Sequence, residues 1–272
     1  MKSFIQSSLT LLLLLTAFNI NASELKVMTY NIWGLPFPIA KRIKRFKVLK
    51  KIIAKQDVDF IGFQEAFTRT ALKVTKHKNF PHVAYGPKKC LLNLSSGLVL
   101  ISKYPIVKTD TIKYKECQGW DCRANKGVLF AQVNIKNELI DVYVTHLNAE
   151  GEDFGPRLSQ MNQLIKFVQK NSTGNKTIFL GDFNFQPSSF LHDHMTTILG
   201  LNDSHQEYVL DNPDLSADER NGYTNRKLTK RIDYVWSSPE LLVNESKVIM
   251  KERLYKNETL SDHKAVRTSL NY

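Results

Sequence analysis

Two polar side chains, Asp182 and Asn184, directly follow an apolar run in the stretch Ile-Phe-Leu-Gly-Asp-Phe-Asn at residues 178–184. The run predicts a buried strand that brings both side chains to the edge of a sheet. Because residues two apart on an extended backbone point to the same side, we expect Asp182 and Asn184 to share one site. Taken alone, Gly-Asp-x-Asn after a strand is more often a capped turn.

Similar polar residues stand at the ends of other apolar segments. They are Asn31, Glu65, His146, Asp233, and Asp262 with His263. Each could cap a turn, but the whole set contains only Asn, Asp, Glu and His. Carboxylate oxygens with few other protein ligands suit Mg²⁺, which keeps bound waters and takes ligands from phosphate groups. Two histidines near carboxylates suit proton transfer near neutral pH. No Ser or Cys lies in a nucleophile-elbow motif, so we expect water to be the nucleophile.

The segments that must position these residues read mainly as strands. We expect strands at 25–31, 57–64, 82–85, 97–102, 111–114, 127–135, 139–145, the run from 178, 232–236 and 265–270. Helical periodicity predicts helices at 40–56, 155–170 and 188–199. Many strands joined by short turns, with few helices, predict an α+β (α/β) fold of two packed mixed β-sheets with helices outside.

The helix predicted at 40–56 is strongly basic. Eight Lys and Arg residues lie between Lys41 and Lys55 with no acidic residue among them, and its apolar residues fall on one face. Two interpretations stay open: an ordinary solvated outer face, or a surface that docks on phosphates.

Residues 1–22 predict a secretory signal peptide, with Lys2, an apolar core at 9–18 and a small-residue cleavage site ending at Ala22. Cleavage would remove Lys2 and lower the formal net charge from +12 to +11. We expect residues 23–272 to form a single domain, because no linker or repeat divides them. The localisation expected is extracellular or periplasmic. The positive charge favours an anionic partner: nucleic acid, a phospholipid surface or a phosphorylated substrate.

Three cysteines in an exported chain allow at most one disulfide. Pairing of Cys90 with Cys117 or with Cys122 would close a medium loop, and pairing of Cys117 with Cys122 a tight one. We expect no zinc site, because no Cys or His pair with ligand spacing has a second pair behind it.

Six motifs in order resemble those of the endonuclease/exonuclease/phosphatase (DNase I-like) superfamily. They are residues 27–33, Gly62-Phe63-Gln64-Glu65, Thr145-His146-Leu147, Gly181-Asp182-Phe183-Asn184, Arg231-Ile232-Asp233-Tyr234 and Ser261-Asp262-His263. The resemblance implies a four-layer α/β/β/α sandwich with the site at one end of the packed sheets. It also implies hydrolysis of phosphate esters with Mg²⁺, for which Mn²⁺ or Co²⁺ could substitute.

The loop at 117–127 resembles that of the secreted bacterial and neutral sphingomyelinases, with Asp121 five residues before Lys126. In the neutral enzymes this pair is implicated in switching the site on. Cys90 and Cys117 lie in places similar to the disulfide of the secreted bacterial enzymes. The plain alternative is that Asp121 and Lys126 form an ordinary surface ion pair, worth about 0–1 kcal/mol.

The chain departs from that resemblance before its last motif, where the secreted sphingomyelinases carry a long aromatic hairpin that inserts into membrane. Here the corresponding segment, residues 236–261, is short and offers few large apolar side chains. We therefore expect membrane contact at the loop 33–39 and at the basic helix that follows it.

The family pattern assigns a role to each candidate residue. Glu65 would hold Mg²⁺, with Asn31 orienting it or binding through water. Asp233 would hold His263 as the base that takes a proton from water. His146 and Asn184 would donate hydrogen bonds to the transition state. Asp182 would orient the water or protonate the leaving group, Asp262 would support the metal or the water indirectly, and Lys126 would keep the Asp121 loop closed or meet the phosphate.

The favoured function is hydrolysis of sphingomyelin, or a related phospholipid, to phosphocholine and ceramide by a monomeric enzyme at a membrane surface. The alternative enzyme is a secreted DNase or RNase, favoured by the positive charge. A third class, a non-catalytic lipid-binding protein, is disfavoured because Glu65, His146 and His263 are all present.

Overall fold

A computed structural model of the chain describes residues 23–36, 44–90, 93–149, 154–251, 253–254 and 258–272. The predicted signal peptide, the start of the predicted basic helix and the end of the loop 33–39 lie outside these residues. Among the residues described, no helix is long and apolar enough to cross a membrane.

The first of two large sheets has six strands and contains both ends of the described chain. In spatial order they are β11 (Leu242–Ile249), β14 (Ala265–Asn271), β1 (Glu24–Asn31), β2 (Phe60–Gln64), β4 (Val99–Ser102) and β3 (His82–Tyr85). Only β1 and β2 are parallel, with Asn31 opposite Gln64, so both strands end at the same edge. The residue after β2 is Glu65.

The second sheet also has six strands. In spatial order they are β5 (Ile106–Lys113), β6 (Gly127–Ile135), β7 (Glu138–His146), β8 (Lys176–Asp182), β10 (Asp233–Ser237) and β9 (Asn202–Asp203). The hairpin between β6 and β7 turns at Lys136 and Asn137, as predicted, and both residues have positive φ as a tight hairpin turn requires. Strands β7 and β8 are parallel, with His146 opposite Asp182.

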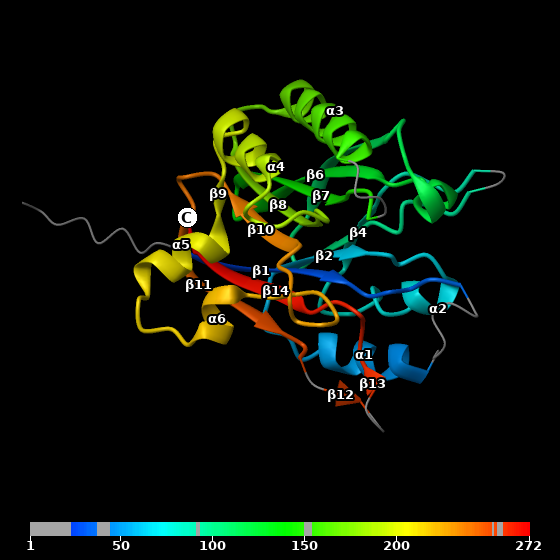
Figure 1. Cartoon of the computed structure of the whole chain (residues 1–272), viewed down its shortest axis with the longest axis horizontal. Helices are drawn as coiled ribbons and strands as arrows, with labels where there is room; N and C mark the ends of the chain where they lie inside the picture. Colours follow the sequence, from blue (N-terminus) through cyan, green and yellow to red (C-terminus); the bar gives the residue numbers. More distant parts are fainter. Residues whose placement is uncertain (1–22, 37–43, 91–92, 150–153, 252, 255–257) are drawn as a thin grey trace, which may run out of the picture.

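Helices cover the outer faces of the two sheets, which confirms the predicted four-layer arrangement (Figure 1). The helices are α1 (Lys44–Ile53), α2 (Arg69–Leu72), α3 (Gly155–Asn171), α4 (Phe190–Asp193), α5 (Ser204–Asp211) and α6 (Ala217–Asn221), with a 3₁₀ turn η1 (Gly119–Arg123) and a π turn η2 (His194–Ile198). A small separate hairpin pairs β12 (Arg253–Leu254) with β13 (Glu258–Thr259).

Three apolar clusters correspond to the three interfaces between the layers. One lies between the sheets, one beneath α1 and α2, and one beneath α3 and α4. The sheets approach closely at Gly62, where an added Cβ would lie 2.8 Å from the Cβ of Leu180. This tight central contact holds the strand ends of both sheets in fixed relative positions.

Several predicted boundaries were wrong. The strand predicted at 57–64 begins only at Phe60, because the Asp59 carboxylate instead accepts a hydrogen bond from the backbone N–H of Lys26. The strand predicted at 111–114 is the end of the longer β5, and the helix predicted at 188–199 is split into α4 and η2.

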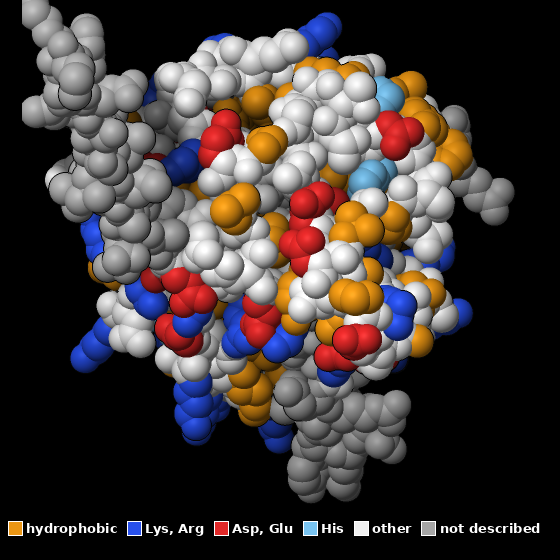
Figure 2. Space-filling view, turned by 90° about the vertical axis from the view of Figure 1, so that its left-hand side faces the viewer, with side chains coloured by type: hydrophobic (Ala, Val, Ile, Leu, Met, Phe, Trp, Pro, Cys, Tyr) orange, Lys and Arg blue, Asp and Glu red, His pale blue; other side chains and the backbone are white. Residues whose placement is uncertain are grey.

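The positive charge of the chain is not concentrated on the face that Figure 2 presents. Acidic and basic side chains lie beside one another there, and neither sign forms a continuous patch. On this face, an extended phosphate backbone would meet both attractive and repulsive groups.

Candidate active site

Strand ends from both sheets meet at one edge of the sandwich. The parallel pairs β1/β2 and β7/β8 place their carboxyl ends there. Strands β10 and β14 run antiparallel to β8 and β1, so their amino ends reach the same edge, with Asp233 directly opposite Asp182. The structure therefore brings together most of the polar residues that the sequence singled out.

His263 and Asp233 form the best-defined pair of the site. The Nδ1 of His263 lies 2.8 Å from Oδ2 of the buried Asp233, and its Nε2 lies 3.6 Å from Oδ2 of Asp182. Burial alone would lower the pKa of His263, but the carboxylates of Asp233 and Asp182 outweigh it and raise that pKa well above its ordinary value. Hydrogen bonding to Asp233 leaves Nε2 as the nitrogen that faces Asp182.

Glu65, Asn31 and Asp182 form a second, linked group. The side-chain amide of Asn31 donates to Oε1 of Glu65 at 3.1 Å and to Oδ2 of Asp182 at 3.0 Å. Its amide oxygen accepts from the backbone N–H of Trp33 at 3.0 Å. Burial raises the pKa of Asp182 to about 7, because the enclosed position disfavours the charged carboxylate.

The backbone at Glu65 is held in an unusual conformation. Its φ of 58° lies in the left-handed region, as do those of Trp33 and Asn184. Gly34 and Gly97 pack against it, and a Cβ on Gly34 would lie only 2.2 Å from the carbonyl oxygen of Glu65. The two glycines therefore allow the close packing that fixes this carboxylate at the sheet edge.

The donor set at Glu65 fits a hard divalent cation. Its Oε2 is buried, and no group among the described residues hydrogen-bonds to it. Burial raises the pKa of Glu65, and the nearby Asp262 raises it further. A buried carboxylate oxygen without a partner is costly unless a proton or a cation balances it. Oxygen ligands of this kind suit Mg²⁺.

A second group with metal-ligand chemistry consists of Asp182, Asp233 and His263, whose ligand atoms all lie within 4.8 Å of one another. In this group Oδ1 of Asp233 is also buried without a partner among the described residues. Because Nδ1 of His263 and Oδ2 of Asp233 are already engaged with each other, we favour Glu65 as the cation ligand.

His146 approaches the same carboxylate oxygen of Asp182 as His263 does. Its Nε2 is 3.4 Å from Oδ2 of Asp182 and 2.9 Å from Nζ of Lys126. Since an ammonium group can only donate, this Nε2 accepts from Lys126 and the ring proton resides on Nδ1. Burial and the positive charge of Lys126 lower the pKa of His146 well below its ordinary value, so its ring is neutral at pH 7.

Lys126 uses all three of its N–H donors. Besides His146 it donates to the carbonyl oxygen of Leu147 at 2.9 Å and to Oδ1 of Asp121 at 2.8 Å. The ammonium group is buried and the Asp121 side chain is only 17% exposed, so this pair is not an ordinary surface ion pair.

Asn184 lies beside Asp182, although it does so for a different reason than the sequence predicted. Asn184 does not continue the strand, because β8 ends at Asp182 and the φ of Asn184 is 52°. It stays beside Asp182 because its backbone N–H donates to Oδ1 at 3.1 Å, while its side-chain amide donates to the carbonyl oxygen of Leu147. Asp262 accepts from the hydroxyl of Ser261, and burial raises its pKa.

The disulfide suggested by the resemblance, between Cys90 and Cys117, was wrong. The structure pairs Cys117 with Cys122, the tight alternative, with their Cα atoms 5.2 Å apart. The sulfur of Cys90 instead lies 3.5 Å from the side-chain nitrogen of Asn125. The turn at η1 brings Cys117 and Cys122 within bonding geometry.

The sequence analysis missed two supporting residues, Arg45 and Thr224, and noted a third, Arg231, only as part of a motif. Arg45, within the basic helix, is buried, and its guanidinium donates to the carbonyl oxygens of Ile32, Trp33 and Leu260. It thereby ties the end of β1 to the segment that carries His263. The hydroxyl of Thr224 accepts from the backbone N–H of Asp233. Arg231, two residues before Asp233, forms a buried ion pair with Asp203 at 2.7 Å. An arginine among lysines and an isolated threonine carry no sequence signal of such roles.

Comparisons with known proteins agree on one family for this chain. The model of the endonuclease/exonuclease/phosphatase family matches residues 28–263. An inositol phosphosphingolipids phospholipase C of Schizosaccharomyces pombe is 27% identical over 92% of this chain and 69% of the relative. A sphingomyelinase of Mycobacterium tuberculosis is 29% identical over 60% of this chain, which spans about a third (34%) of that relative.

A solved structure of beta toxin from Staphylococcus aureus with bound magnesium ions has the same fold. Its TM-score is 0.69 at 18% identity, and the match covers 92% of this chain and 100% of the toxin. At that identity the likeness is evidence of the fold.

Proposed function

The chain belongs to the endonuclease/exonuclease/phosphatase family and is a phosphoric diester hydrolase, and on this premise we propose that it cleaves the head-group phosphodiester of sphingomyelin or a related phosphosphingolipid. With sphingomyelin the products are phosphocholine and ceramide. The chain acts after export, a proposal supported by the signal-like residues 1–22 and by the disulfide, which persists in oxidising compartments.

The observation that carries the lipid assignment is the contact chain from Asp121 through Lys126 to His146. It joins the sphingomyelinase-like loop to a histidine of the family motif. The names of the S. pombe and mycobacterial relatives support the same substrate class.

Glu65, supported by Asn31, would hold the divalent cation, which we propose is Mg²⁺. When bound, it supplies Lewis-acid polarisation of a non-bridging phosphate oxygen. The magnesium ions in the beta toxin structure support this choice of metal.

His263 is the general base in its neutral form, which its raised pKa favours at higher pH. Its Nδ1 is engaged with Asp233, so Nε2 takes the proton of the attacking water, and Asp233 stabilises the imidazolium that forms. Asp182, 3.6 Å from that Nε2, orients the same water. The water oxygen bonds to phosphorus, the bond from phosphorus to the ceramide oxygen breaks, and that oxygen takes up a proton from solvent water as it leaves, while protonated His263 returns its proton to solvent.

Lys126 supplies positive charge beside the transition state. Because Nε2 of His146 accepts from it, we revise the role of His146 in this resting arrangement: it holds the ammonium group in place. A buried positive charge stabilises developing negative charge on the phosphate more than an exposed one does.

Exposed aromatic side chains give the proposed membrane contact. Phe154 and Phe190 follow the strands that end at His146 and Asp182, are 47% and 42% exposed, and have ring centroids 5.4 Å apart. The guanidinium of Arg45 lies 5.4 Å from the Trp33 ring, which is only partly exposed. We therefore assign lipid contact to Phe154 and Phe190 in addition to the loop that begins at Trp33.

The test is head-group release from vesicles containing sphingomyelin, with Mg²⁺ and with a chelator, beside an assay on plasmid DNA and RNA. Metal-dependent release of phosphocholine supports the proposal. Degradation of nucleic acid without lipid cleavage would overturn it in favour of a nuclease of the same family.

A further inference from the structure

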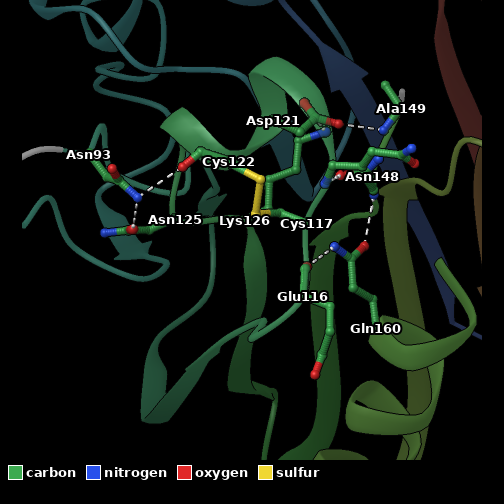
Figure 3. Close-up of a disulfide and its surroundings, with 11 residues drawn as sticks. Asn93, Glu116, Cys117, Asp121, Cys122, Asn125, Lys126, Asn148, Ala149 and Gln160 are labelled. Carbon is green, nitrogen blue, oxygen red and sulfur yellow. Dashed lines mark hydrogen bonds and ion pairs between the residues drawn. A yellow bond between two sulfur atoms is a disulfide. The ribbon is translucent and has the colours of Figure 1, made fainter. Parts of the chain in front are cut away.

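The disulfide lies at the base of the loop that carries Asp121. Figure 3 shows Cys117 and Cys122 bonded beneath the η1 turn, with Asp121 above them facing Lys126 and the backbone of Ala149. Oδ1 of Asp121 is 2.8 Å from Nζ of Lys126, and Oδ2 accepts from the N–H of Ala149 at 2.5 Å. One carboxylate therefore links the loop to two parts of the site.

The loop has almost no packing of its own. None of residues 115–124 is buried, and the Trp120 side chain is 75% exposed. Lys126 and His146, by contrast, are 5% and 2% exposed. An exposed loop without apolar burial opens at low free-energy cost, so its geometry depends on its cross-links.

Apart from the two contacts of the Asp121 carboxylate, hydrogen bonds near the two bases of the loop hold it in place. On one side, Gln160 donates to the carbonyl oxygen of Glu116 at 2.7 Å. On the other side, Asn93 donates to the carbonyl oxygen of Cys122 at 3.0 Å (Figure 3). Between them, Gln118 donates its N–H to Asn148. The disulfide joins the two sides directly and closes the short segment that presents Asp121.

We infer that the Cys117–Cys122 disulfide is a positioning element of the active site, which holds Asp121 on Lys126, and that its reduction lowers turnover without unfolding the enzyme. Only the choice of a lipid as substrate rests on the proposed function. The contacts of Asp121 and Lys126 would act on any phosphodiester bound at the site. Cys117 is exposed, so a soluble reductant can reach the bond.

The redox step is a thiol–disulfide exchange. A dithiol reductant such as dithiothreitol gives two electrons and two protons, the Sγ–Sγ bond breaks, two thiols form, and the dithiol closes to its cyclic disulfide. Released from the cross-link, the η1 segment samples conformations in which Asp121 no longer reaches Lys126. The ammonium group then loses its charged partner and its fixed position.

The experiment uses the full exported chain with Cys90→Ser as the background, so that only one disulfide can form. Turnover is measured on sphingomyelin vesicles and on bis(p-nitrophenyl) phosphate, with the disulfide oxidised, reduced and reoxidised. We expect reduction, or the double variant Cys117→Ser/Cys122→Ser, to lower kcat at least about tenfold with little change in KM, and reoxidation to restore it. No turnover of vesicles in any redox state, with the expected loss on bis(p-nitrophenyl) phosphate, would count against the lipid function alone, whereas an unchanged kcat on bis(p-nitrophenyl) phosphate would overturn the disulfide inference.

Two further readouts separate positioning from general stability. In an Asp121→Ala background, reduction should cause no further loss of kcat, because the contact that the disulfide secures is already removed. Chemical acetylation of Lys126, followed by mass spectrometry, should be slow in the oxidised protein and faster in the reduced one, while the surface residue Lys170 is labelled equally in both. An equal further loss in the Asp121→Ala background, or unchanged protection of Lys126, would contradict the inference.

Discussion

Glu65→Gln gives the sharpest test of the cation site. The substitution keeps the size and shape of the side chain and can keep the hydrogen bond from Asn31, but it removes the charge. Oε2 of Glu65 is buried without a partner among the described residues, so the wild-type carboxylate is the group that a cation would stabilise.

The expected magnitude follows from binding linkage. A cation at about 100 times its dissociation constant stabilises the folded state by about 2.7 kcal/mol. In a domain of this size each kcal/mol shifts Tm by about 2–4 °C, so Mg²⁺ should raise the wild-type Tm by about 5–11 °C. Glu65→Gln should abolish most of that rise.

Without metal, the expected order of stability of the wild type and Glu65→Gln reverses. Burial raises the pKa of Glu65 in the folded state, so the folded state binds more protons than the unfolded state between the two pKa values. The contribution of Glu65 to the free energy of unfolding is fully present at pH below its unfolded pKa and is lost as pH rises through its folded pKa. At pH 7 in chelator, Glu65→Gln should therefore be at least as stable as the wild type, and this difference should vanish as pH falls below the unfolded pKa of about 4.3.

The assay is thermal unfolding by calorimetry, with chelator and with Mg²⁺, of the wild type, Glu65→Gln and the control Glu138→Gln. Glu138 begins β7, at the far end from His146, and pairs with Lys176. The control should keep the wild-type response to Mg²⁺. If Glu65→Gln showed the same rise in Tm as the wild type, the assignment of the cation to Glu65 would be refuted.

Three further outcomes are expected. Asp233→Asn should lower kcat by about 10²–10⁴-fold in steady-state kinetics, because it no longer stabilises protonated His263; an unchanged kcat would exclude this role. Burial would raise the pKa of Asp203, but the charges and hydrogen bonds of Arg231 and His192 together outweigh it and lower that pKa. Asp203→Asn should therefore reduce the free energy of unfolding at pH 7 by about 3–5 kcal/mol in urea, and the deficit should shrink as pH falls below about 4; a deficit that persists at low pH would contradict this. Phe154→Ser should lower the rate on vesicles by about tenfold and leave the rate on a soluble phosphodiester unchanged; equal losses on both would exclude a lipid contact.

The strand ends were predictable because each apolar run stops where a polar residue begins. His146, Asp182 and Asp233 all stand at the ends of buried strands, as their sequence context predicts. Strand β11, by contrast, carries Asn244, Glu245, Ser246 and Lys247 on an edge that is half exposed, so it lacks the apolar pattern of a strand. Its pairing with β14 supplies the order that its own sequence does not.

The supporting contacts of the site could not be predicted, because they depend on tertiary distance. Arg45 reads as one of many basic residues on a helix, yet it is buried and bonds to carbonyl groups far apart in the chain. With three cysteines, composition leaves three pairings open, and only the turn at η1 selects Cys117 with Cys122. The same turn decides whether Asp121 can reach Lys126.

Hydrolysis of sphingomyelin in water enriched with ¹⁸O tests the central claim most directly. If water activated by His263 attacks phosphorus, the label must appear in phosphocholine and not in ceramide, and release must require Mg²⁺ and fail in His263→Ala. Label in the ceramide hydroxyl, or equal release by His263→Ala, would contradict the account.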